Sequence, residues 1–364
     1  MIRSMDGWLV LDKPSGVTST RVGAVVKKVL GAGVCEDAGA AALRGGGFSA
    51  FVRRGVCRIG HVGTLDPLAT GVLVLAVGEA TKLVPYLEKY TCARKGYDFS
   101  VVFGISTDTL DLDGQVVQRD TKIPRLEGLQ AVCERMLGEQ LQVPPVFSAL
   151  RINGRRSYEL ARSGCPQEPK ARAITIHSLR LNHFDTAPQA FCDLGSACAS
   201  FSVECSGGTY VRSLARDVAE KLGCLATVIA LRRTQDRIFP LQDAFTLDFL
   251  RKIAQKGMVR DVLIPMEFVL DSLPEVLITD EFLEKLRNGA AFQVSRDTSG
   301  LAAVTGSAAT MATEDGLASK DAAAPGSSSL EEGVCVRVKH AGRLLGIGVL
   351  RGELCFPKRV LNVF

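Results

Sequence analysis

Residues 60–73 combine reactive and turn-forming side chains more densely than any other part of the chain. Their sequence, Gly-His-Val-Gly-Thr-Leu-Asp-Pro-Leu-Ala-Thr-Gly-Val-Leu, contains one histidine, His61, and one aspartate, Asp66. Glycines permit unusual backbone angles and Asp-Pro favours a turn, so such a loop can hold a carboxylate rigidly while a substrate backbone approaches. Residue types alone leave two interpretations: Asp66 is a reactive carboxylate, or it only caps a turn. His61 by itself is equally compatible with a packing role.

The other histidines and the cysteines lack the spacing of a metal site. The chain has 11 cysteines and four histidines, and no Cys-x-x-Cys pair. The closest set, Cys192, Cys198 and Cys205, fits neither a zinc knuckle nor a disulfide framework. The acidic stretch 106–114 lacks the spacing and the closing glutamate of an EF-hand. We therefore expect reduced thiols and no metal.

The loop at 60–73, called the reactive loop from here on, must be positioned by short strands and amphipathic helices. Val22, Val26 and Leu30 recur at helical spacing, which predicts a helix capped by Ser19. Residues 97–103 alternate in polarity, which predicts a strand with one buried face. Further strands are predicted at 8–11, 70–78, 173–184, 200–205 and 227–232, and further helices at 79–87, 126–137 and 209–222. Many strands with scattered helices indicate an α+β fold.

Two stretches contain too few large apolar residues to fold. Residues 31–58 hold seven glycines and many alanines, and are predicted to form an exposed flexible insertion. Residues 299–333 are rich in Ala, Ser, Gly and Thr, and are predicted to be a disordered insertion. The second stretch interrupts a small β unit that begins near Leu273 and continues from 334 to 360. The sequence therefore predicts two domains.

Charge and hydropathy narrow the class of protein. The net charge is +5, but residues 302–333 contain one lysine and five acids, so the rest of the chain carries +9. Such a surplus suits a polyanionic partner, with a plain basic protein as the alternative. The longest apolar run, 72–77, has six residues, which is too short to span a bilayer, and no signal peptide is recognised. We expect a cytoplasmic protein with no membrane segment.

The loop at 60–73 resembles the catalytic motif of the TruB family of pseudouridine synthases. Further segments resemble other blocks of that family, in the same order and at similar distances. These segments are 7–16, 78–82, 95–97, 147–151, 154–162, 205–214 and 231–234. The resemblance extends from residue 7 to about residue 250, apart from the stretch 31–58. The C-terminal unit resembles, more faintly, the PUA RNA-binding domain of bacterial members.

The resemblance implies a fold and a division of the chain. Residues 1–250 are expected to form the pseudouridine synthase catalytic domain, with a mixed, mostly antiparallel sheet, flanking helices and a central RNA cleft. Residues 270–364 are expected to form a small PUA-like β barrel that binds RNA. The insertions 31–58 and 299–333 depart from the family pattern, and neither removes a motif residue.

The resemblance also implies a reaction, the isomerisation of uridine to pseudouridine at position 55 in the T arm of tRNA. The base leaves through its N1–C1′ bond, turns and rejoins through C5, which needs a nucleophile and no cofactor. Asp66 matches the nucleophile, and a carboxylate can form a covalent adduct and then leave. Arg212 matches the arginine that pairs with the aspartate. Tyr97 matches the tyrosine that stacks on the base, and its hydroxyl is a candidate for the C5 proton transfer.

Four more residues match the family's substrate-binding positions. The target uridine lies inside a folded loop, so it must be flipped out before attack. His61 resembles the residue that fills the vacated space, Tyr210 and Leu231 resemble pocket-lining residues, and Lys13 resembles the lysine that supports the tyrosine. Candidate phosphate contacts are Lys82, Lys95, Arg151, Arg156 and Arg162.

The expected partner is the T stem-loop of tRNA, and we expect a monomer with no obligate protein partner. Two other functions remain compatible with the sequence. The first is a non-catalytic RNA-binding or tRNA-folding protein, although a binder would not need Asp66, Tyr97 and Arg212 together. The second is a related synthase that modifies another RNA or needs a guide RNA. The short C-terminal unit and the absence of basic tails favour the stand-alone enzyme.

Overall fold

A computed structural model describes residues 5–38, 58–186, 197–296, 302–303 and 333–362. The chain divides into two compact units. The large unit comprises Gly7–Gly78 and Thr91–Ile264, and the small unit comprises Met1–Asp6, Glu79–Tyr90 and Pro265–Phe364. Residues 79–90 therefore fold with the C-terminal part of the chain. The predicted domains 1–250 and 270–364 remain a prediction.

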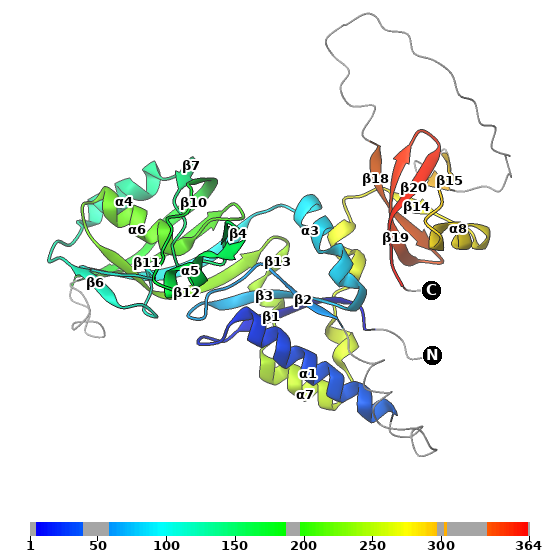
Figure 1. Ribbon diagram of the computed structural model, residues 1–364, viewed down its shortest axis with the longest axis horizontal. Coiled ribbons are helices and arrows are strands. Elements are labelled where there is room, and N and C mark those ends of the chain that lie inside the picture. Colours follow the sequence, from blue (N-terminus) through cyan, green and yellow to red (C-terminus); the bar gives the residue numbers. More distant parts are fainter. Residues whose placement is uncertain (1–4, 39–57, 187–196, 297–301, 304–332, 363–364) are drawn as a thin grey trace, which may run out of the picture. The chain divides into compact units, whose positions relative to one another are not determined.

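A nine-stranded sheet forms the centre of the large unit (Figure 1). Seven strands follow the order β1-β3-β12-β4-β11-β10-β7, while β2 pairs with β3 and β13 pairs with β12. Only the β3–β12 pair is parallel. The strands are β1 (Gly7–Lys13), β2 (Ile59–Val62), β3 (Thr70–Val77), β4 (Lys95–Phe103), β7 (Gly138–Gln142), β10 (Arg172–Asp185), β11 (Ala197–Cys205), β12 (Ala226–Asp236) and β13 (Phe239–Pro240). The predicted mixed, mostly antiparallel sheet is confirmed.

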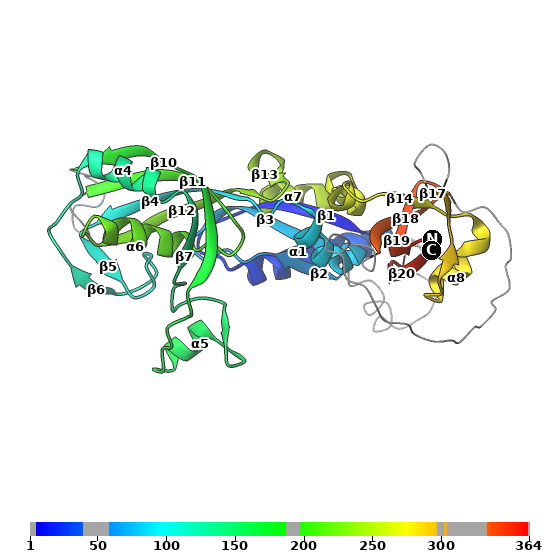
Figure 2. The same ribbon diagram turned by 90° about the horizontal axis from the view of Figure 1, so that it is seen from above.

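Helices and two small ribbons complete the large unit. They are α1 (Ser19–Ala38), α4 (Leu126–Arg135), α5 (Ser157–Arg162), α6 (Val211–Lys221), α7 (Leu247–Gln255) and the ribbons β5–β6 (Ile105–Thr107, Val116–Arg119) and β8–β9 (Arg151–Ile152, Arg155–Arg156). Helix α6 packs on β4 and β12, and α1 packs on α7 and β2. Figure 2 shows that α5 and its ribbon project away from the sheet.

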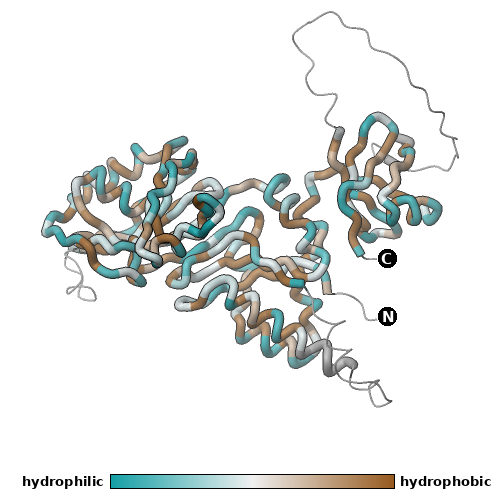
Figure 3. Tube along the Cα trace, in the orientation of Figure 1, coloured by the Kyte–Doolittle hydropathy of each residue, from teal (hydrophilic) through white to brown (hydrophobic). Residues whose placement is uncertain are grey.

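The core of the large unit follows from its apolar strands. Every residue from Val72 to Val77 is fully buried, as are Trp8 and Phe103. Figure 3 shows hydrophobic residues running along these central strands. A strand that is apolar on both faces is stable only between neighbours and covering helices. This burial makes β3 a rigid support for the loop that precedes it.

The small unit contains a seven-stranded sheet in the order β15-β20-β19-β18-β14-β17-β16. Its strands are β14 (Glu275–Leu277), β15 (Phe292–Gln293), β16 (Ser295–Arg296), β17 (Ala302–Ala303), β18 (Val334–His340), β19 (Arg343–Arg351) and β20 (Leu354–Val360). Its helices are α3 (Val84–Tyr90) and α8 (Leu283–Arg287), and shorter 3-10 turns include Gly78–Leu83 and Met266–Leu270. This sheet is the PUA-like unit that the sequence predicts.

The structure corrects the predicted insertions in part. Residues 31–38, predicted to be flexible, continue helix α1. Once a helix is nucleated each added residue gains a hydrogen bond, so the glycines there do not stop it. Residues 302–303 form a strand that pairs with β14 and β16, although they belong to the predicted disordered insertion. The remainder of both predicted insertions lies outside the described residues, apart from Arg58 and Gly333.

The predicted cap of helix α1 is wrong by one residue. The hydroxyl of Thr18 accepts a hydrogen bond from the Arg21 N–H at 3.2 Å, which is the interaction of a helix cap. The Ser19 hydroxyl is therefore available for another contact. It accepts from the Leu65 N–H at 2.9 Å and donates to the Leu65 carbonyl at 3.2 Å.

Candidate active site

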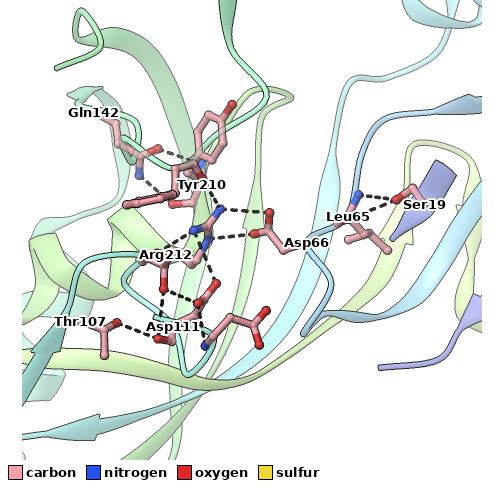
Figure 4. Close-up of polar contacts among 11 residues, drawn as sticks. Ser19, Leu65, Asp66, Thr107, Asp111, Gln142, Tyr210 and Arg212 are labelled. Atoms are coloured by element: carbon pink, nitrogen blue, oxygen red, sulfur yellow. Dashed lines mark hydrogen bonds and ion pairs between the residues drawn. The ribbon is translucent and has the colours of Figure 1, made fainter. Parts of the chain in front are cut away.

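Asp66 and Arg212 form a two-pronged ion pair, although 146 positions separate them in sequence (Figure 4). The Arg212 Nε lies 2.8 Å from one carboxylate oxygen of Asp66, and Nη2 donates to the other at 3.0 Å. The Arg212 side chain is 5% exposed, whereas that of Asp66 is 33% exposed. A planar guanidinium in this geometry fixes the direction of a carboxylate. The Asp66 carboxylate is thus held by a buried guanidinium and is still partly accessible to solvent.

A second carboxylate holds the same guanidinium. Arg212 Nη1 donates to the Thr109 carbonyl at 2.6 Å and lies 3.5 Å from the Asp111 carboxylate. Asp111 is almost fully buried and accepts hydrogen bonds from the Thr109 hydroxyl and the Asp113 N–H. Burial raises the pKa of Asp111, and the Thr109 hydrogen bond and Arg212 oppose that shift. The sequence alone identifies residues 106–114 only as an acidic stretch that lacks the spacing of an EF-hand calcium site.

The loop that carries Asp66 is tied to the N-terminal segment. The Lys13 ammonium donates to the carbonyls of Pro14, Val17 and Pro67 at 3.0, 2.6 and 3.1 Å. Ser19 binds both backbone groups of Leu65, the residue before Asp66. Burial lowers the pKa of Lys13 to about 8, and the Asp66 charge opposes that shift. Lys13 therefore fixes the backbone directly after Asp66.

Helix α6 presents Arg212, and a glutamine from the sheet edge fixes its start. The Gln142 side chain accepts from the Tyr210 N–H at 2.8 Å and donates to the Tyr210 carbonyl at 3.2 Å. Tyr210 precedes the helix and has no side-chain cap of its own. The Ser213 hydroxyl donates to the Val143 carbonyl at 2.8 Å. No sequence pattern pointed to Gln142, because its role depends on strand β7 lying beside this helix.

Tyr97 lies on β4, directly opposite Arg233 on one side and Val203 on the other. It is buried, and burial raises the pKa of its hydroxyl, while the Arg233 guanidinium acts in the opposite direction. Its other ionisable neighbours are Asp236 and Cys205. The tyrosine is therefore a neutral phenol in the free protein, with a buried guanidinium beside it.

Comparison with known sequences relates this geometry to a reaction. Residues 52–211 match the sequence model of the TruB family pseudouridylate synthase (N terminal domain), and residues 212–271 match that of the tRNA pseudouridylate synthase B C-terminal domain. The tRNA pseudouridine synthase B of Zymomonas mobilis is 38% identical over 286 residues, which are 79% of this chain and 84% of that protein. This chain belongs to the TruB family.

Membership of the TruB family makes the chain an isomerase that converts uridine to pseudouridine in tRNA. A relative from Nitrobacter winogradskyi, also called tRNA pseudouridine synthase B, is 35% identical over 99% of this chain and 84% of its own length. The crystal structure of the archaeal box H/ACA sRNP Nop10-Cbf5 complex contains a chain with a TM-score of 0.58 and 20% identity, covering 99% of this chain and 87% of that one. At that identity the likeness confirms the predicted pseudouridine synthase fold alone.

The other residues that the sequence predicts to bind substrate lie on neighbouring elements of the large unit. His61 is half-buried on β2, shortly before Asp66, and its Nδ1 is buried without a hydrogen bond to any described residue. Tyr210 is half-buried beside Ser148, and burial raises its pKa while that hydroxyl opposes the shift. Leu231 is almost buried on β12, opposite Phe99 of β4.

Two predicted phosphate contacts are engaged within the protein. Lys82 pairs with Glu79 at 2.6 Å in the small unit, where Glu79 also accepts from the Asn362 N–H at 2.7 Å. Lys95 is 14% exposed and lies 3.6 Å from the buried Asp236. Arg151 and Arg162 are exposed on the projecting ribbon and α5, and Arg156, half-buried there, donates to the Ala149 carbonyl at 3.0 Å.

Within the described ranges, no group of three or more histidine, cysteine and acidic side chains is arranged to hold a metal ion. None of the described helices combines the length and hydropathy needed to cross a membrane. The buried thiols include Cys133, Cys205, Cys224 and Cys355, and each has a raised pKa, chiefly because burial disfavours the thiolate.

Proposed function

We propose that this chain isomerises the uridine at position 55 in the T arm of tRNA, with Asp66 as the nucleophile. One observation carries the proposal. Of the carboxylates that contact Arg212, Asp66 is one-third exposed while Asp111 is 4% exposed. Only Asp66 can therefore meet a substrate atom, and Arg212 already fixes its direction.

The reaction needs only groups that the chain itself supplies. The N1–C1′ bond of the nucleoside breaks, a C5–C1′ bond forms, N1 gains a proton and the hydrogen on C5 leaves. An aspartate carboxylate can form a covalent adduct with the substrate and be displaced later. The net change is an isomerisation with no oxidation, so we propose that no cofactor takes part.

The pocket residues then receive roles that their positions support. The uridine must be flipped out of the folded T loop before attack. We assign Tyr97 to stacking on the base and Tyr210 and Leu231 to the walls of the pocket. His61, half-buried on β2 at the start of the reactive loop, is assigned to the space that the base vacates. Lys13 is assigned to support of the loop through the Pro67 carbonyl.

The projecting segment β8–β9–α5 supports contact with the RNA backbone. The segment projects away from the sheet (Figure 2). Three of its arginines, Arg151, Arg155 and Arg162, are exposed. Guanidinium groups on such a projection can contact phosphates and position the T arm without reading its sequence. We further propose that 1–250 is the catalytic domain, that 270–364 binds RNA, and that the enzyme is a cytoplasmic monomer without an obligate protein partner.

Tritium release tests the reaction and its nucleophile together. Unmodified tRNA transcript carrying 5-³H-uridine is incubated with the wild type and with Asp66→Asn, and the product is mapped. We expect release from the T-arm uridine with the wild type and none with Asp66→Asn. Asp12→Asn is the matched control, because Asp12 also pairs with an arginine at 2.7 Å, but with Arg232 and not with Arg212.

The other outcomes separate the alternative functions. Binding of the transcript without any release by the wild type would favour the RNA-folding protein. Release from a different uridine would keep the chemistry and change the substrate. Equal release by the wild type and Asp66→Asn would remove Asp66 from the role of nucleophile.

A further inference from the structure

Two consecutive arginines on β12 have opposite environments. Arg232 is 39% exposed and forms a two-pronged pair with Asp12 at 3.1 and 2.7 Å. Arg233 is 0% exposed and points to the other face of the sheet. Burying a guanidinium completely is unfavourable, because the charge loses its hydration, unless its surroundings compensate for that loss. The contacts of Arg233 must therefore compensate for the loss of its hydration.

Three features fix Arg233 close to the reactive loop. Its Nε donates to the Val72 carbonyl at 2.7 Å, and Nη2 lies 3.3 Å from the Asp236 carboxylate. Its backbone is so close to Gly71 that a Cβ there would lie 2.1 Å from the Arg233 carbonyl oxygen. Gly71 also has φ +94°, which disfavours any other residue. The end of the reactive loop thus packs directly on Arg233.

The guanidinium faces Tyr97. Arg233 and Tyr97 are directly opposite each other on paired strands, and Arg233 is the charged group with the largest effect on the tyrosine. Its positive charge and its polar contact with the hydroxyl both lower the pKa of Tyr97, against burial. Neither Nη1 nor Nη2 makes a well-formed hydrogen bond to a described residue, and both are buried. The guanidinium thus keeps N–H groups that are able to donate to the hydroxyl of the tyrosine opposite it.

We propose that Arg233 is a positioning residue for Tyr97: its guanidinium donates to the tyrosine hydroxyl, which stays protonated, and holds it in one orientation in the pocket. The inference rests on the proposed function, in which Tyr97 faces the flipped uracil. A guanidinium suits this task better than an ammonium, because it donates through several fixed N–H groups at once.

Asp236 allows this cation to stay buried. Its carboxylate is 1% exposed and also lies 3.6 Å from both Lys95 and Arg237. One carboxylate thus faces three cations, which leaves a net positive field next to Tyr97. The Gly63 backbone covers the cluster, because a Cβ there would lie 3.0 Å from the Lys95 ammonium. The cluster consequently connects Tyr97 with both ends of the reactive loop.

A double-mutant cycle tests the proposal. Arg233→Gln, Tyr97→Phe and the combination are compared with the wild type by tritium release from the tRNA transcript, with kcat and KM measured separately. We expect Arg233→Gln to lower kcat about tenfold or more and to leave KM within about twofold. In the Tyr97→Phe background, the same substitution is expected to lower kcat less than about twofold, because the hydroxyl on which it acts is gone.

Arg232→Gln is the matched control, since it removes an arginine from the same strand and is expected to keep kcat within about twofold. Thermal melting verifies that each variant is folded. If Arg233→Gln does not fold, the same cycle is run with Arg233→Lys, which keeps a buried positive charge and loses the planar group. In either cycle, a loss of kcat that occurs only when residue 97 carries its hydroxyl supports the proposal.

Additive losses in the cycle, or an unchanged kcat in a folded Arg233 variant, would overturn it. Failure of the proposed function is distinguishable, because it appears as absence of release from the T-arm uridine with the wild type itself. A wild type that releases tritium there, together with an additive cycle, overturns the role of Arg233 alone.

Discussion

Replacing Gln142 by leucine tests whether the edge strand β7 sets the position of Arg212. Gln142 is 2% exposed and holds both backbone groups of Tyr210. The Tyr210 carbonyl also accepts from the Leu214 N–H at 2.9 Å, so it keeps a partner in the variant. Only the Tyr210 N–H loses its acceptor, and an unpaired buried amide costs about 1–3 kcal/mol. For a domain of this size, that corresponds to a fall in Tm of about 2–4 °C per kcal/mol.

The same change should also reduce activity, because Arg212 lies two residues after Tyr210 in the segment that Gln142 fixes. We expect Gln142→Leu to lower kcat in the tritium assay at temperatures where the variant is fully folded. Gln140→Leu is the control. Gln140 lies on the same face of β7 and donates to the Met136 carbonyl at 2.9 Å, but it is only half-buried. Its loss should cost about 0.5–1.5 kcal/mol and leave kcat near the wild-type value.

The refuting result is specific. Equal shifts of Tm in the two variants would mean that the Tyr210 contact adds nothing beyond an ordinary partly exposed hydrogen bond. A folded Gln142→Leu enzyme with normal kcat would mean that helix α6 holds Arg212 in place without β7. Either outcome would remove Gln142 from the set of positioning residues.

Three further predictions concern the groups around the reactive loop. Asp111→Asn removes a charged partner of the Arg212 guanidinium, which costs about 1.5–3 kcal/mol. The variant should therefore have a kcat about tenfold or more below that of the wild type, with little change in KM. Lys13 has a pKa lowered to about 8. Above that pH its neutral amine has only two N–H groups for three carbonyls, so activity should fall as the pH rises through about 8. The Lys13→Arg variant should not show this fall in kcat. Gly71→Ala forces a Cβ against the Arg233 carbonyl at φ +94° and should destabilise the protein by more than about 4 kcal/mol, which Tm and the soluble yield would reveal.

Local sequence reasoning was successful where neighbouring residues determine the structure. The apolar alternation at 97–103 and the run at 72–77 gave strands because burial of a pleated face depends on residues two apart. It was less accurate at element ends. Thr18 and Ser19 have the same capping chemistry, and only the position of Leu65 decides that Thr18 caps the helix. Residues 31–38 likewise continued a helix that their glycines alone disfavour.

The candidate site shows the same division. The motif around Asp66 indicated its chemical class through resemblance, and its pairing with Arg212 was expected on the same basis. Asp111 and Gln142 were not singled out, because Asp111 contacts Arg212 from 101 positions away and Gln142 contacts Tyr210 from 68 positions away. Lys82 and Lys95 were predicted to contact phosphates, which stays a prediction; in the free protein each of them lies beside a carboxylate. A basic residue in a motif does not reveal whether its partner is RNA or another side chain.

The sequence by itself determined the kind of protein: its α+β pattern, its positive excess, the reactive loop and the family whose motifs it carries. The tertiary structure alone decided which residues support that loop. The fold buries the side chains of Arg212 and Asp111 and leaves that of Asp66 partly exposed. Arg233 lies opposite Tyr97 because β4 and β12 pair in one register. The physical reason is that burial, ion pairing and the accompanying pKa shifts depend on distances in space, which strands distant in sequence create only when they join one sheet.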